Sequence, residues 1–387
     1  MVEGDLLRTE TVRVFNEYAF SSKPIREVLK QLDPTNIKIL STMAEVGPRN
    51  ILDVSRLTGI PFTTIYHRIA QIESKSGQVA ILLPNVARLG MVRVVLLVAA
   101  KPGLEDIVTQ ALRIPNYWRV LERCEGAFTH HSIQTIPVKF LKEFREYIST
   151  MQAMNLIKSY RIIQTGDSHP IFPDFTNYSS GSGDWVFDWD GWLNEVRTGT
   201  PTQNIHDPKG EPLALEKIDL QIIAALEQDA RMNFTDIAKK INTSPQTVKY
   251  HYDRKLVAGG VVDGFDFYLN PYPVEISAFH EFMLEFSDAA SMNRFFSVSK
   301  KLFFIRQLAK ALRKNTLLVR TRIIGSQVEN MFTFFSEMVN AGQLTSYSAV
   351  RLNMNSRLAQ TISYELFDDV SGWQWDIYGL LLQLNKL

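Results

Sequence analysis

The chain has 387 residues, which is too long for one ordinary domain and predicts roughly two to four. An apolar fraction of 45% and a charged fraction of 21% are those of folded proteins and exclude a disordered chain. The single cysteine, Cys124, excludes an internal disulfide framework and a cysteine-rich zinc site. The longest apolar run, Val94 to Ala100, is far shorter than the roughly 20 residues that span a bilayer, and no signal-peptide pattern is present. We therefore expect a cytoplasmic protein with no membrane contact.

The net charge of +1 neither supports nor excludes nucleic acid binding, because affinity for phosphate depends on local clusters of charge. One basic cluster lies between residues 231 and 255. It contains Arg231, Lys239, Lys240, Lys249, Arg254 and Lys255 against Asp236 and Asp253.

Residues 1–31 predict an amphipathic arm whose role the sequence does not reveal. Residues 32–84 then predict a winged helix-turn-helix, with apolar side chains at helical spacing along three short segments. Asp33 caps the first helix, and Asn50 with Asp53 begins the second. The third helix, from about Phe62 to Ile72, is the expected recognition helix. The side chains that its pattern leaves outward or lateral, and that we expect to contact DNA, are Thr63, Thr64, Tyr66, His67 and Arg68.

Residues 90–166 predict a ferredoxin-like βαββαβ domain. The expected strands and helices are Val92–Ala99, Leu104–Leu112, Tyr117–Arg123, Phe128–Thr135, Lys139–Met154 and Ile157–Gln164. Residues 167–212 follow as a linker rich in Gly, Ser, Pro and Asp. Aromatic residues are too dense in its run 187–192 to be solvated, so we expect that run to dock on its own half of the chain or on the opposite one.

Residues 213–271 predict a second winged helix-turn-helix. Asn233 caps its second helix, and Ser244 caps its third helix ahead of Pro245, where the missing N–H costs nothing. Val248 must pack inward. This leaves a set of donors and cations on or near the outer side as candidate DNA contacts, namely Gln246, Thr247, Lys249, Tyr250, His251 and Arg254.

Residues 276–353 predict a second ferredoxin-like domain, and residues 356–387 a tail that again carries aromatic residues at 367–373. The expected elements are Ala278–Phe286, Ala289–Val298, Phe303–Lys310, Thr316–Ile323, Gln327–Ala341 and Ser346–Leu352. The second half therefore repeats the plan of the first. At an offset of 183, the residues Asn50, Asp53, Thr64, Gly77 and Val79 fall on identical residues in the second copy.

The second helical region carries a family resemblance. The pairs Ile237-Ala238 and Ser244-Pro245, with the wing entry from Gly260 to Phe265, resemble the DNA-binding domain of the Lrp/AsnC transcription regulators. The resemblance implies an α+β chain, here with two copies of the helix-turn-helix and ferredoxin-like pair, and a prokaryotic source. It also implies an effector near the loop that holds Gly126, Phe128 and Thr129, although the acidic residue of the family's loop signature is missing in both halves. Pro61-Phe62 replaces Ser-Pro in the first copy, which removes a cap worth about 1 kcal/mol.

Alternative chemistries have weaker support. His130 and His131 are adjacent, so on a strand they face opposite ways and do not form a metal pair. Cys124 lacks a base at motif spacing, and no phosphate loop, dinucleotide motif or paired acids are present, so we expect no catalytic residue, no metal and no cofactor.

We therefore expect a regulator that binds double-stranded DNA through two non-identical recognition helices. Its two sandwich domains should pair within the chain as an intramolecular pseudo-dimer. Two other classes stay open. One is a winged-helix protein adaptor, and the other is an enzyme of the sirohaem decarboxylase kind, which the family resemblance also admits. The enzyme would need a pocket rich in His and Arg, for which the loops and strand ends supply little beyond His130, His131 and Arg123.

Overall fold

The structure is a computed structural model that describes residues 33–76, 80–179, 181–182, 184–208, 210–267, 272 and 274–387. The expected N-terminal arm, residues 1–31, lies outside these described residues. Within them, none of the helices combines the length and the apolar character needed to cross a membrane.

The first helical unit contains α2 (Pro34–Val46), α3 (Ile51–Thr58) and α4 (Phe62–Ser76). Asp33 caps α2, since its Oδ1 accepts a hydrogen bond from the Asn36 amide at 2.7 Å, and Asn50 caps α3. One apolar face of each helix is buried in a common core, which contains Ile39, Leu40, Met43, Ile51, Val54, Ile65 and Ile69. The three predicted helices are present, and the third runs four residues further than the expected end at Ile72.

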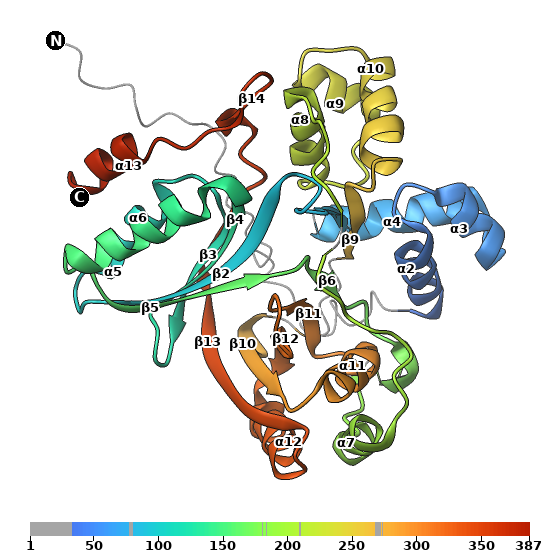
Figure 1. Ribbon diagram of the computed structural model, residues 1–387. Helices are drawn as coiled ribbons and strands as arrows, with labels where there is room; N and C mark the ends of the chain where they lie inside the picture. The colour runs from blue at the N-terminus through green and yellow to red at the C-terminus, as the bar shows by residue number, and fades with distance from the viewer. Residues whose placement is uncertain are drawn as a thin grey trace.

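The second helical unit contains α8 (Lys217–Leu226), α9 (Phe234–Lys240) and α10 (Pro245–Tyr250), and α10 runs on as the π-helical segment η3 (His251–Val257). Asn233 caps α9, accepting from the Asp236 amide at 2.8 Å. Figure 1 shows this unit at the top of the molecule and the first unit at the right. Its core joins that of the first sandwich domain and includes Leu220, Ile222, Ile223, Leu226, Ile237 and Val248.

The wings differ from the prediction. The sequence predicts a β-wing within each helical unit, whereas β1 (Ala80–Pro84) pairs with β9 (Val262–Phe267) of the other half in an antiparallel ribbon. Leu82 and Phe265, which the offset of 183 aligns, are direct partners in this ribbon. The ribbon therefore joins the two helical units, and the two aligned residues face each other near its middle.

The first sandwich domain has β2 (Met91–Ala100), β3 (Trp118–Glu125), β4 (His130–Pro137) and β5 (Ile157–Thr165), in the order β5-β2-β4-β3. Two helices, α5 (Glu105–Arg113) and α6 (Leu141–Ala153), cover one face of this sheet. Alternation of side chains decides the faces: Val94, Leu96 and Val98 pack under the helices, whereas Arg93 and Val95 point to the opposite, inner face.

The second sandwich domain repeats this arrangement with β10 (Ser277–Phe286), β11 (Ile305–Lys310), β12 (Thr316–Ile324) and β13 (Leu344–Ala359). Their order is β13-β10-β12-β11, which matches the first sheet strand for strand. The helices α11 (Ala289–Val298) and α12 (Val328–Asn340) cover its outer face, where the largest buried aromatics are Phe282, Phe295 and Phe335.

The two sheets join within the chain into one nine-stranded sheet. β13 runs past its own domain and pairs with β3, while β6 (His169–Pro170), just after β5, pairs with β11. Thr165 also bridges to Ala311, so the far ends of the sheet meet and its inner faces oppose each other. Apolar side chains from both halves pack in that interior, including Val95, Ile133, Leu318 and Met283. This is the pairing expected of an intramolecular pseudo-dimer.

The two aromatic segments dock on the opposite halves. The described residues between 167 and 212 include β6, a short hairpin of β7 (Tyr178–Ser179) with β8 (Asp184–Trp185), and α7 (Trp189–Thr198), which packs on α11 and α12. The tail holds β14 (Phe367–Asp368), β15 (Gly372–Trp373) and α13 (Ile377–Leu384), which packs on α6. The expected docking of the run 187–192 is confirmed, because its aromatic side chains pack into the core of the second domain.

Candidate DNA-binding surface and an arginine-lined cavity

The second recognition helix, α10 with η3, presents polar side chains around the buried Val248. Ser244 Oγ accepts a hydrogen bond from the Thr247 amide at 3.0 Å, which fixes the start of the helix, and Pro245 occupies its first position. Gln246, Lys249, Tyr250 and Arg254 are exposed and Thr247 is half-buried, all as expected for side chains that face a partner.

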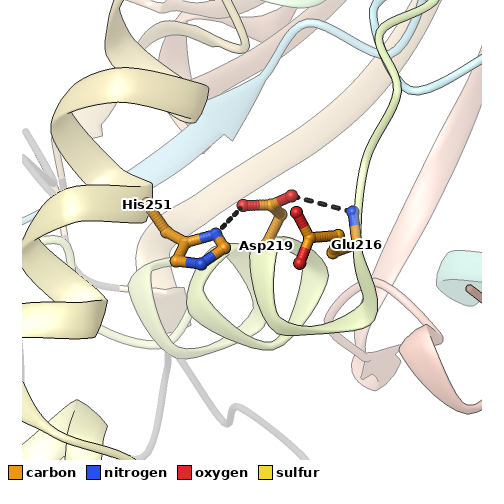
Figure 2. Close-up of side chains that lie close together, drawn as sticks. All are labelled: Glu216, Asp219 and His251. Carbon is orange, nitrogen blue, oxygen red and sulfur yellow. Dashed lines mark hydrogen bonds and ion pairs between the residues drawn. The ribbon is translucent and has the colours of Figure 1, made fainter.

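His251 lies elsewhere than expected. It is buried, and its Nδ1 lies 2.7 Å from Oδ1 of Asp219 on α8. Figure 2 shows Asp219 held between this ring and the backbone nitrogen of Glu216, from which its other oxygen accepts a hydrogen bond at 2.8 Å. The contact fixes the recognition helix to the first helix of the unit, so His251 does not reach the outer surface. His251 lies three residues after Val248 and therefore on the same, inward helix face. The prediction that it is exposed followed from its polar side chain and not from this spacing.

The same three residues, Glu216, Asp219 and His251, lie close enough together to resemble a metal site. Their ligand atoms already have protein partners. Both Asp219 oxygens accept hydrogen bonds, and Glu216 joins a capping box at the start of α8 and pairs with Lys255 at 3.4 Å. The cluster therefore fits a capping and helix-packing role.

α4, which the sequence predicts as the other recognition helix, exposes Thr63, Thr64, Tyr66 and His67 around the buried Ile65. Arg68 is half-buried instead. Its Nη1 donates to Asp33 Oδ2 at 2.6 Å and to Asn36 at 3.0 Å, at the start of α2. Arg68 therefore occupies the place that His251 has in the second unit, and both tie the third helix to the aspartate that begins the first helix.

The two helical units are held directly against each other. Arg49, between α2 and α3, donates to the carbonyls of Ala230 and Met232 at 2.9 and 2.8 Å, and its guanidinium lies over the rings of Phe234 and Tyr252. A second link is the ion pair between Glu73 and Arg231. These contacts set the orientation of the two helical units relative to each other.

The loop expected to bind an effector lies between β3 and β4. Gly126 has a φ of 125°, and Thr129 is bonded within the domain: its Oγ1 accepts from the Ala100 amide at 2.9 Å. Phe128 lies under the guanidinium of Arg161 at 5.7 Å. These contacts account for the loop's shape, and the prediction of an effector there stays a prediction.

His130 and His131 face opposite sides of β4, as the strand geometry predicts. His130 Nε2 lies 3.0 Å from Thr109 Oγ1 under the helices, and burial lowers its pKa to about 4. His131 faces the interior, with Nδ1 3.0 Å from Glu122 Oε1. Burial raises the pKa of the Cys124 thiol to about 12, so it is a poor nucleophile.

A cavity of about 210 Å³ lies between the inner faces of the two sheets and the β1–β9 ribbon. Among the described residues, six arginines from five strands line it: Arg93, Arg119, Arg306, Arg320, Arg322 and Arg357. The carboxylates that line it are Asp167, Glu227 and Asp266. The sequence-based expectation that the sandwich domains supply few arginines is therefore wrong.

A network of buried charges adjoins this cavity. Glu122 accepts from Arg320 at 2.6 Å and from Arg357 at 3.1 Å, and Arg320 also bonds Glu281 at 3.0 Å. Burial acts to raise the pKa of Glu122, but the two guanidinium groups outweigh it and hold the pKa well below its usual range. The network fixes β3, β12 and β13 to one another across the junction of the two halves.

Two other ionisable groups at the cavity have shifted pKa values. Burial lowers the pKa of Arg93 to about 10, although the charges of Glu281 and Asp167 favour its protonation. Burial raises the pKa of Asp167 to about 6, while its bond from the Val86 amide, at 3.0 Å, lowers it. For both groups, burial disfavours the charged form.

Sequence patterns contain little sign of this cavity, because its arginines come from strands far apart in the chain. One local signal exists. On β12, Arg320 and Arg322 alternate with the buried Leu317, Val319 and Ile323, so two cations share the face turned away from the helices.

Comparison with known proteins identifies one part of the chain. The family profile described as the AsnC-type helix-turn-helix domain matches residues 215–254. An uncharacterized HTH-type transcriptional regulator of Pyrococcus horikoshii is 35% identical over 74 residues, which are 19% of this chain and 46% of the relative. A protein of the same description from Pyrococcus abyssi is 36% identical over 67 residues, 17% of this chain and 42% of that one. The chain thus spans less than half the length of either relative.

Among solved structures, the siroheme decarboxylase NirDL covers 90% of this chain and 99% of its own, with a TM-score of 0.53 and 9% identity. Its co-complex with an iron-uroporphyrin III analogue matches with a TM-score of 0.52 and 10% identity. At such low identity the likeness shows a shared fold. Residues 215–254 are an AsnC-type helix-turn-helix domain, and the two regulators named above are similar to this chain over less than a fifth of its length.

Proposed function

We propose that this protein is a sequence-specific DNA-binding transcription regulator with two non-identical recognition helices on one chain. The observation that carries the proposal is the second helical unit: an AsnC-type helix-turn-helix whose capped third helix exposes Gln246, Lys249, Tyr250 and Arg254. An amide and two cations on one face are the groups that contact base edges and phosphates.

The first helical unit is, in this proposal, a second copy of the same module. Its three helices follow the same order, and Arg68 contacts Asp33 as His251 contacts Asp219. The pairing of the aligned residues Leu82 and Phe265 supports a duplicated chain folded about a pseudo-two-fold axis. Such a chain would present two recognition helices without a second subunit.

Mobility shifts over a range of salt concentrations test the proposal. Removing a cation that binds a phosphate should weaken binding to all sequences and lower the salt slope by about one. We expect this for Lys249→Ala and for Arg254→Ala. Arg351→Ala is the matched control, because Arg351 is an exposed arginine on β13, paired with Glu125 at 3.4 Å. Wild-type behaviour of both recognition-helix variants at every salt concentration contradicts the assignment.

A second candidate function is an enzyme of the sirohaem decarboxylase kind. Two observations favour it: the fold shared with NirDL over 90% of the chain, and the arginine-lined cavity, since guanidinium groups bind carboxylates. Incubation of the full chain with sirohaem, followed by mass analysis of the tetrapyrrole, tests it. Loss of carboxylate mass at a catalytic rate supports the enzyme, and an unchanged tetrapyrrole leaves the regulator.

A further inference from the structure

The interior cavity combines buried positive charge with open space. Its arginines come from both halves of the chain, and most of them have carboxylate or carbonyl partners. Arg320 and Arg357 bind Glu122, and Arg119 pairs with Glu227. The two remaining paired arginines are Arg306, 3.5 Å from Asp266, and Arg322, which donates to the Tyr272 carbonyl.

Arg93 is the exception in this set. It is 6% exposed, and among the described residues its side chain has one hydrogen bond, from Nη1 to Thr165 Oγ1 at 3.1 Å. Within the same part of the chain no carboxylate oxygen lies within ion-pair distance of it. A guanidinium has five N–H donors, so Arg93 turns unused donors toward the cavity that it lines.

The charge balance of the interior points to an anion. Six arginines line the cavity, whereas its lining and the adjoining network together supply five carboxylates among the described residues: Glu122, Asp167, Glu227, Asp266 and Glu281. Of these, Asp167 has a pKa raised to about 6, so it takes up a proton, and loses its negative charge, closer to neutral pH than an ordinary aspartate does. A buried cation without a paired anion is unfavourable, and a bound anion would supply the missing partner.

The size of the cavity limits the ligand. At about 210 Å³ it is smaller than the roughly 300–1,000 Å³ of pockets for drug-sized molecules. An ion with a few non-hydrogen atoms fits such a space. Planar forks of donors match the oxygens of carboxylate and phosphate groups.

The cavity is also placed to affect the recognition helices. One wall is β1, which leads from the first helical unit and pairs with β9 of the second. Two of the lining arginines hold the helical units to the sheets: Arg119 on β3 through Glu227 at the end of α8, and Arg306 on β11 through Asp266 on β9. An anion that draws these two arginines inward competes with Glu227 and Asp266 and so loosens both attachments.

We propose that the interior cavity binds a small dianion bearing carboxylate or phosphate groups, held at Arg93, and that this ligand weakens DNA binding. The regulatory part rests on the proposed DNA-binding function, and the binding part does not. Phosphate and carboxylate ligands share the chemistry of the site, so two probes separate them: inorganic phosphate and succinate.

Isothermal titration of the full chain with each probe tests the binding part. We expect saturable binding of at least one of the two at one site per chain. Arg93→Met should weaken it at least tenfold, because a charge-assisted hydrogen bond of about 1.5–3 kcal/mol corresponds to roughly 10–100-fold in affinity. Arg93→Lys should retain part of the affinity, which a purely structural role of Arg93 would not explain, and thermal melting verifies that both variants fold. The control Arg351→Met should bind as the wild type does.

A DNA-binding measurement at constant ionic strength, set with potassium chloride, tests the regulatory part. The probe that binds should lower the DNA affinity of the wild type about three- to tenfold and leave that of Arg93→Met unchanged. Saturable binding of neither probe, or equal binding by the wild type and Arg93→Met, overturns the cavity proposal even if DNA binds. Absence of DNA binding with intact anion binding overturns the proposed function and leaves the anion site standing.

Discussion

The buried carboxylate of Glu122 should be among the most costly single groups to neutralise in this protein. Its side chain is wholly buried, with Oε1 2.6 Å from Arg320 and Oε2 3.1 Å from Arg357. Glu122→Gln keeps the shape and removes the charge, leaving two guanidinium groups without their shared partner. Breaking a buried ion pair from one side costs about 3–5 kcal/mol, and we expect Glu122→Gln to lose that much free energy of unfolding at pH 7.

Urea unfolding followed by circular dichroism measures this loss, and the same strand offers the control. Glu125 also pairs with an arginine, Arg351, but both side chains are exposed, at 67% and 63%. Glu125→Gln should therefore cost about 0–1 kcal/mol. Losses that agree within about 1 kcal/mol for the two variants would refute the argument that burial makes the difference.

The pH dependence gives a second measurement on Glu122. Its folded-state pKa lies below its unfolded value, so its contribution to stability is present above the unfolded pKa and is lost as the pH falls toward the folded one. Wild-type stability should therefore decline below about pH 5 more steeply than that of Glu122→Gln. Parallel curves would show that the charge of Glu122 does not stabilise the fold.

Three further changes have defined outcomes. Ser244→Ala removes the cap of the second recognition helix and should cost about 1 kcal/mol in urea unfolding. Asp167→Asn should stabilise the protein by roughly 2–3 kcal/mol at pH 8 and little at pH 4, because burial raises the folded-state pKa of Asp167 to about 6, so the cost of its ionisation develops as the pH rises from about 4 and is complete above about 6; equal effects at both pH values would contradict this. Arg49→Ala should reduce affinity for DNA that spans both recognition helices more than for a half-length site in fluorescence anisotropy, since Arg49 fixes one helical unit against the other.

The local elements of this fold were predictable because their signals are local. Alternation along a strand and three- to four-residue spacing along a helix depend on neighbours in the sequence, and they placed α11 and β12 within about a residue of their bounds. The caps at Asn233 and Ser244 were readable for the same reason, since each bonds an amide three residues on.

The exchanges between the two halves were not predictable in this way. β1 pairs with β9, and β13 pairs with β3. These pairings depend on which exposed strand edges meet during folding. A chain with two similar halves offers each strand one partner in its own half and an equivalent partner in the other. The cavity arginines share this difficulty, because only the pairing of distant strands brings them together. His251 is a different case: its spacing from Val248 placed it inward, and its polar character was misleading.

The operator of this protein should be asymmetric, because the two recognition helices expose different side chains at aligned positions. The first exposes Tyr66 and His67 where the second exposes Lys249 and Tyr250. Arg68, one of the expected DNA contacts, is bonded to Asp33, so base reading should depend more on Gln246, which can pair with adenine for about 1–3 kcal/mol of discrimination.

Selection from random DNA distinguishes the possible arrangements of the site. Two unlike sequence blocks about one helical turn, or roughly 34 Å, apart are the result expected if both helices read bases. Gln246→Ala should then relax one block alone, and Tyr66→Ala the other, because each helix contacts its own half-site. A single block that Gln246→Ala relaxes and Tyr66→Ala leaves intact would mean that the first unit, which lacks a Ser-Pro cap, serves only as structure. A true palindrome would contradict asymmetric reading, since equal half-sites require equal recognition helices and therefore two chains on one site.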